Sequence, residues 1–238
     1  MTTAFAPIPR LRGRVDYRRR ADAELWGFED WSITRLPDGT RTMAAHCEMR
    51  LGADWVVRDS TLSAHADWRP ADAFVRIARD GRTTGTGWFR FTDGEAECES
   101  WSIDAGRLSQ RMPVEHTLRG FGVHAVQADG WLAARFPYDR GAGHEHFFGR
   151  NLIHSLHHLG ATGPYLHTTE SGLRYLGPET VTVPAGTFDC HRIAFVGMTN
   201  GHPPYDMWIT RDGAFLYVKG EVGGYMDSVF ELTALDDG

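Results

Sequence analysis

Trp31-Ser-Ile-Thr-Arg-Leu-Pro-Asp38-Gly39 is the first of four stretches in which a strand pattern led by tryptophan runs into a tight turn. An Asp-Gly pair suits a two-residue hairpin, because both central residues of such a turn take positive φ. Residues 88–94, 101–106 and 208–213 repeat the pattern, and their flanks are rich in aromatic and β-branched residues, which favour strands. The four stretches predict antiparallel hairpins.

Two further Asp-Gly pairs, Asp80-Gly81 and Asp129-Gly130, add turn candidates, so six turns are expected in all. A sheet of so many strands protects its edges best by curving into a barrel or half-barrel. We therefore expect a mainly β fold, either an antiparallel curved sheet or a lipocalin-like β-barrel. Large aromatic residues are available to fill its interior, and they are Trp55, Phe74, Trp88, Phe89, Phe91, Trp101, Trp131, Phe136, Trp208, Phe215, Tyr217 and Phe230.

The domain organisation is expected to be simple. The chain has 238 residues, of which 42% are hydrophobic, and it contains no Pro-, Gly- or Ser-rich linker that would divide it. Residues 21–238 are predicted to form a single β-barrel-like domain. Residues 1–20 carry six arginines, and Asp16, Asp22 and Glu24 lie among them or just after them, which predicts a basic N-terminal arm that is solvated or takes part in a homodimer contact.

The overall charge and the cysteines exclude several classes of protein. A formal net charge of -6 disfavours nucleic-acid binding, which needs a basic face. Cys47, Cys98 and Cys190 are far apart and form no C-x-x-C pair, which indicates a reducing compartment. With neither a secretory h-region nor an apolar stretch long enough to cross a bilayer, the sequence predicts a cytoplasmic protein without a membrane partner.

One segment departs from the strand pattern. Phe148, Leu152, Leu156 and Leu159 follow a four-four-three spacing that would form one apolar stripe, and Gly160 suits the position just after a helix end. This spacing predicts one helix around residues 145–159 that caps the sheet. Asn151 would lie on its opposite side, together with His154 and His158.

Five of the twelve histidines lie between residues 144 and 158, which suggests acid/base chemistry because histidine titrates near neutrality. We expect His146, His154 and His158 as candidate catalytic residues, with Tyr165 as a hydrogen-bond donor to a developing oxyanion. The competing interpretation is a polar helix face in which histidine has no catalytic role.

Metal binding is a second interpretation of the same histidines, because His144-x-His146 is a spacing that could reach one ion. However, Phe148 stands where an H-E-x-x-H helix would need its second histidine. Nucleophile-elbow, Walker A and dinucleotide fingerprints are also missing from the sequence. We therefore expect no cofactor, and His144 and His146 remain alternative metal ligands.

The last third of the chain contains three further motifs. They are Val181-Thr-Val-Pro-Ala-Gly-Thr-Phe-Asp-Cys-His-Arg-Ile193, Asp206-Met-Trp-Ile-Thr-Arg-Asp-Gly213 and the closing strands Phe215-Leu-Tyr-Val-Lys219 and Phe230-Glu-Leu-Thr-Ala-Leu235. In these motifs the chain resembles the domain-of-unknown-function 3108 family. The resemblance covers about a quarter to a third of the sequence. It implies a curved antiparallel sheet and assigns no catalytic residue.

The residues favour three functions. The first is a cofactor-independent lyase, isomerase or dehydratase that acts on a hydrophobic or aromatic small molecule in a β-barrel cavity, with histidine as acid and base. Asn151, Trp208 and Tyr217 would contact that substrate. The alternatives are a non-catalytic protein that binds an apolar ligand, and a histidine-ligated metal enzyme.

Overall fold

The computed structural model describes residues 8–114, 118, 120–199, 201–224 and 226–237. These residues form one sheet of fifteen strands in the order β8-β7-β6-β5-β4-β3-β2-β1-β15-β14-β13-β12-β11-β10-β9. Every neighbouring pair is antiparallel except β9 and β10. The predicted mainly β fold with a curved antiparallel sheet is confirmed, and the sheet stays open, because β8 and β9 are its two edges.

The first half of the sheet is a meander of eight strands. They are β1 (Arg10–Arg19), β2 (Leu25–Arg35), β3 (Arg41–Leu51), β4 (Asp54–Ala64), β5 (Pro70–Arg79), β6 (Arg82–Phe91), β7 (Glu95–Ser102) and β8 (Gly106–Pro113).

The second half begins at the other edge and returns to the centre. It comprises β9 (Phe121–Gly122), β10 (Glu145–Ile153), β11 (His167–Val183), β12 (Gly186–Val196), β13 (Tyr205–Thr210), β14 (Tyr217–Val222) and β15 (Ser228–Asp236). Strand β15 pairs with β1, with Tyr17 opposite Phe230, so the first and last strands meet in the middle of the sheet.

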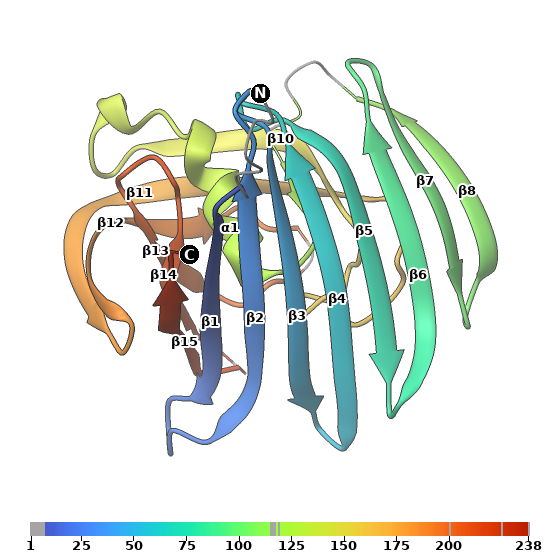
Figure 1. Cartoon of the computed structure of the whole chain (residues 1–238), viewed down its shortest axis with the longest axis horizontal. Helices are drawn as coiled ribbons and strands as arrows, with labels where there is room; N and C mark the ends of the chain where they lie inside the picture. The colour runs from blue at the N-terminus through green and yellow to red at the C-terminus, as the bar shows by residue number, and fades with distance from the viewer. Residues whose placement is uncertain (1–7, 115–117, 119, 200, 225, 238) are drawn as a thin grey trace, which may run out of the picture.

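Between β9 and β10 the chain forms the helix α1 (Val126–Leu132) and two short 3-10 turns, η1 (Ala133–Arg135) and η2 (Tyr138–Arg140). Helix α1 lies inside the curve of the sheet, with strands of the first half on one side and strands of the second half behind it (Figure 1). Contacts with β9 and β14 hold it there. No helix among the described residues has the length and apolar character needed to cross a membrane.

Five of the six predicted turns join neighbouring strands. Asp38-Gly39, Asp80-Gly81, Asp93-Gly94, Ala105-Gly106 and Asp212-Gly213 all lie between antiparallel partners. The sixth prediction was wrong, because Asp129-Gly130 lies within α1.

The helix predicted around residues 145–159 is also wrong. Glu145–Ile153 is strand β10, which pairs antiparallel with β11 and parallel with β9, and the residues that follow form turns. The supposed apolar stripe is broken, since Leu156 is 51% exposed. The side chains of the turn satisfy its backbone: Ser155 Oγ accepts a hydrogen bond from the amide of His157, and His157 Nδ1 accepts one from the amide of Leu159. Such local bonds compete with a helix.

The basic N-terminal arm predicted for residues 1–20 is largely a strand. Arg10–Arg19 is β1, which pairs with β2 on one side and β15 on the other. Its arginines alternate with inward residues such as Val15 and Tyr17, both buried, and Arg14 and Arg18 form ion pairs with Asp16. Residues 1–7 of the predicted arm lie outside the described part of the chain.

The core follows the concave side of the sheet and surrounds α1. Of the aromatic residues expected inside, Trp55, Trp88 and Trp101 are between 38% and 44% exposed, because strand alternation places them on the outer face. The cysteines Cys47, Cys98 and Cys190 are buried and free.

Candidate ligand-binding site

The concave side of the half-barrel contains a partly open cavity of about 110 Å³. Its surface is mostly apolar and comes from both halves of the sheet and from α1. Its lining residues include Tyr17, Arg58, His124, Asp129, Phe148, Asn151, His158, Leu159, Thr169, Ser171, Phe195, His202, Tyr205 and Phe230. The volume is close to that of engineered apolar cavities of ~150 Å³ that accept benzene, and because the cavity is partly open a longer ligand can extend out of it.

Asp129 is the acidic group among the described residues of the cavity wall and belongs to α1. The hydroxyl of Tyr205 lies 3.3 Å from its Oδ2 and 2.8 Å from the hydroxyl of Tyr217. Because the Tyr205 hydroxyl carries one proton, it donates to only one of these groups at a time. Burial, together with the nearby carboxyl of Glu29, raises the pKa of Asp129 to about 7. A carboxyl with this pKa changes its charge near neutral pH.

A buried ion pair supports this wall from behind. Glu29 of β2 accepts hydrogen bonds from the amides of Val126 at 3.0 Å and Gln127 at 3.1 Å, and so caps the first turn of α1. The N-cap residue Ala125 has no side chain that could do this. The guanidinium of Arg58 lies 3.7 Å from Glu29, and both side chains are at most 2% exposed.

Arg58 also fixes the segments next to the cavity. Its guanidinium donates hydrogen bonds to the backbone carbonyls of His124 and Leu159. The first of these residues precedes α1, and the second lies in the turn after β10. One buried arginine therefore ties β4 to two loops that carry cavity residues.

Among the residues that the structure describes, three histidines line the cavity: His124, His158 and His202. Burial is the main cause that lowers the pKa of each, and it brings His158 to about 4. The rings of His158 and His202 are 6.2 Å apart, and the ring of His158 also stacks on His157 at 4.8 Å. These imidazoles are therefore neutral near pH 7.

The predicted catalytic histidines do not converge. His158 lines the cavity, whereas His154 is fully buried behind it, with its ring 4.6 Å from that of His124. His146 lies on β10 against Phe136 and Phe148. Tyr165 bonds to the hydroxyl of Ser102 outside the cavity lining.

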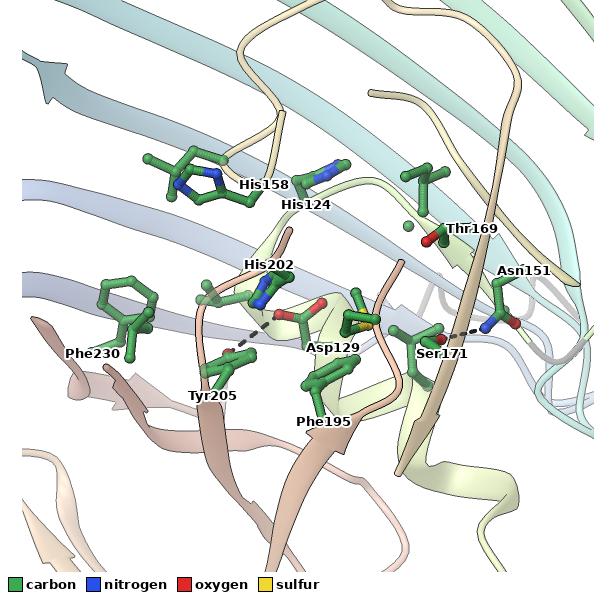
Figure 2. Close-up of a pocket in the computed structure, with 18 of the residues that line it drawn as sticks. His124, Asp129, Asn151, His158, Thr169, Ser171, Phe195, His202, Tyr205 and Phe230 are labelled. Carbon is green, nitrogen blue, oxygen red and sulfur yellow. Dashed lines mark hydrogen bonds between the residues drawn. The ribbon is translucent and has the colours of Figure 1, made fainter. Parts of the chain in front are cut away.

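Of the three predicted substrate contacts, only Asn151 lines the cavity, where its amide donates a hydrogen bond to Ser171 (Figure 2). Tyr217 lies directly behind the wall, against the hydroxyl of Tyr205. Trp208 faces elsewhere, because its indole donates to Glu179 at 2.9 Å and the charged groups of Arg192 and Lys219 lie over its ring. The change of register between β13 and β14 at Trp208 alters which side chains share a face.

The alternative metal ligands His144 and His146 have ring centres 6.4 Å apart, and both rings pack against Phe136. In the described part of the chain, no three His, Cys, Asp or Glu side chains form a group that could hold a metal ion.

Sequence reasoning missed Asp129, His202 and Tyr205. Asp129-Gly130 matches a strong turn pattern, and the group that caps α1 at Val126, Glu29, lies 97 residues before Val126 in the sequence. Tyr205 could have been noticed as a large polar residue at the start of a strand. No pattern in the sequence connects it to Asp129.

No family model and no curated protein matches the chain. Among solved structures, it is similar to a β-barrel-like protein of domain of unknown function DUF1849 from Brucella abortus. The TM-score is 0.56 at 11% identity, covering 98% of this chain and 99% of that one. A DUF1089 family protein from Pseudomonas aeruginosa aligns with a TM-score of 0.45 at 11% identity, covering 84% and 90%. The first likeness supports a β-barrel-like fold, and neither description names an activity.

The buried His154 leads to a testable dependence of stability on pH. Burial and the charge of Arg58 lower its pKa well below 6.5, so the unfolded chain binds a proton near pH 6.5 that the folded chain does not. The free energy of unfolding should therefore fall as pH falls below about 6.5, because protonation of His154 then favours the unfolded chain. We expect His154→Leu to lose less unfolding free energy than the wild type between about pH 7.5 and pH 5.5, as measured by urea denaturation.

His65→Leu is the matched control, because His65 is exposed. An equal loss of stability on acidification in the wild type and His154→Leu would contradict the assignment. The raised pKa values of Glu29 and Asp129 act in the opposite direction, but they are common to the proteins compared.

Proposed function

We propose that the protein binds a small, mainly apolar molecule in the cavity of the half-barrel. The observation that carries this proposal is a partly open cavity with a mostly apolar surface and a few polar side chains gathered at it. This combination is typical of ligand pockets, in which apolar walls supply affinity and a few polar groups fix the orientation.

A binding function has more support than histidine catalysis. Only His158 of the proposed catalytic residues lines the cavity, whereas His146, His154 and Tyr165 do not. A general acid or base has to reach the reacting group within hydrogen-bond distance, directly or through one water molecule. The lyase, isomerase or dehydratase expected from the sequence is therefore the second candidate.

The binding proposal can be tested with N-phenyl-1-naphthylamine, a neutral apolar probe whose fluorescence rises in an apolar environment. Ser171 is 7% exposed and lines the cavity from β11. We expect Ser171→Phe to fill part of the cavity and weaken probe binding by roughly ten-fold or more. The measurement is a fluorescence titration.

The matched control is Glu170→Phe. Glu170 precedes Ser171 on the same strand and is exposed, so the same ring is added to the opposite face of the sheet. Circular dichroism would check that both variants fold. Failure of the wild type to bind the probe, or equal binding by Ser171→Phe, would contradict the proposal.

A further inference from the structure

The charges around the cavity do not balance. Arg58 is the one cationic side chain among the described lining residues, and it already lies beside Glu29 and bonds to two backbone carbonyls. The carboxyl of Asp129 forms no ion pair within the described part of the chain, and its one hydrogen-bond partner there is the neutral hydroxyl of Tyr205. When Asp129 is ionised, Arg58, Glu29 and Asp129 together carry one uncompensated negative charge at the cavity wall.

The same cavity is rich in aromatic rings. Its lining contains Tyr17, Phe148, Phe195, Tyr205 and Phe230. The rings of Tyr205 and Phe195 stack with centres 5.3 Å apart, and both side chains border the same space as Asp129 (Figure 2). Aromatic faces attract cations, and the attraction is stronger where water is excluded.

We propose that the natural ligand is an apolar molecule that carries a protonated amine, with its ammonium group beside Asp129 and its apolar body against the aromatic wall. This inference rests on the proposed binding function and adds the chemical class of the ligand. A carboxylate ligand is disfavoured, because it would place a second negative charge beside Asp129. A neutral alcohol could accept or donate one hydrogen bond but would leave the charge of Asp129 uncompensated.

Three probes that share one apolar body separate these possibilities: 4-phenylbutylamine, 4-phenylbutanol and 4-phenylbutyrate. Each is used at about pH 8 to displace N-phenyl-1-naphthylamine from the wild type, from Asp129→Asn and from Asp139→Asn. We expect the amine to bind the wild type roughly ten-fold more tightly than the alcohol, with the carboxylate weakest. Asp129→Asn should bind the amine and the alcohol about equally.

Asp139→Asn is the matched control, since Asp139 is an exposed carboxylate only ten positions further along the chain. It should keep the preference for the amine. Equal affinities for amine and alcohol in the wild type, or an unchanged preference in Asp129→Asn, would overturn the inference while the binding function stands. If neither the fluorescent probe nor any of the three compounds binds, the proposed function itself fails.

A second measurement needs no variant and therefore decides the question if Asp129→Asn does not fold. The pKa of Asp129 is about 7, so its carboxyl is mostly protonated at about pH 5.5 and the preference for the amine should largely disappear there. The other groups near it are the tyrosines Tyr205 and Tyr217, the pair Glu29 and Arg58, and the histidines His124, His158 and His202. Burial favours the neutral forms of the tyrosines and histidines. A preference that is equally strong at both pH values would overturn the inference.

Discussion

Arg58→Met is expected to lower the free energy of unfolding by about 3–5 kcal/mol, which is the usual cost of removing one partner of a buried ion pair. Methionine retains much of the apolar length of the side chain, so the loss reports mainly on the charged group. Glu29 would keep a buried charge without its cation, although Tyr17 and two backbone amides would still donate to it. Urea denaturation measures the effect.

Two comparisons make this result specific. Arg76→Met on the neighbouring strand removes an exposed arginine and should change stability by less than about 0.5 kcal/mol. The double variant Arg58→Met/Glu29→Gln should lose less unfolding free energy than the sum of the two single variants, because Glu29→Gln removes the carboxylate that Arg58→Met leaves unpaired. A loss below about 1 kcal/mol for Arg58→Met would show that the pair is not coupled in this way.

The effect of Arg58 should also extend to the loops it ties to β4. Its bonds to the carbonyls of His124 and Leu159 hold the backbone on two sides of the cavity. Without them, the wall loses two of its attachments to the first half of the sheet, and N-phenyl-1-naphthylamine should bind more weakly even where the variant is folded. The buried pair thus links the stability of the half-barrel to its ability to bind.

Much of the sheet could be predicted because hairpins are specified locally. Asp80-Gly81 joins β5 to β6 and Asp212-Gly213 joins β13 to β14, and in both cases a short turn pattern lies between strand-forming residues. No local turn pattern predicts the central pairing of β1 with β15. It joins residues such as Tyr17 and Phe230, which are far apart in the chain and have no local pattern in common.

The two errors in assigning helices have one physical origin. Residues 145–153 have helical spacing but gain backbone partners from β9 and β11, whereas 126–132 lacks a local cap but receives one from Glu29. In each case a distant segment satisfied the backbone, and this outweighed the local pattern.

The same reason limited the prediction of the candidate site. The density of histidines between residues 144 and 158 did lead to His158, and Asn151 was expected beside it only through the helix that is wrong; both residues line the cavity. That density could not separate them from His154, which the turn after β10 buries behind the wall. Asp129 lies at the cavity because of packing between α1 and the sheet, and its raised pKa depends on burial that only the folded chain provides.

The close approach of β6 to the segment that follows β10 gives the second large expected effect. A Cβ atom added at Gly85 would overlap the carbonyl oxygen of Gly163 and lie 2.8 Å from Cδ of Pro164. That backbone has little room to move, because the amide of Tyr165 donates to His154 at 2.9 Å. The side chain of Gln110 also bonds to both the amide and the carbonyl of Leu166.

Gly85→Ala should therefore cost about 2–3 kcal/mol of stability, since either β6 or residues 163–166 must shift. The matched control is Gly94→Ala, because a Cβ atom at that position meets nothing within 4 Å. The displaced segment comes shortly after His158 and Leu159 in the chain. Since both of these residues line the cavity, probe affinity should fall together with stability. If Gly85→Ala were as stable as Gly94→Ala, the segment would not be packed against β6. If Gly85→Ala lost stability but kept full probe affinity, the cavity wall would be held in place without the contact with β6.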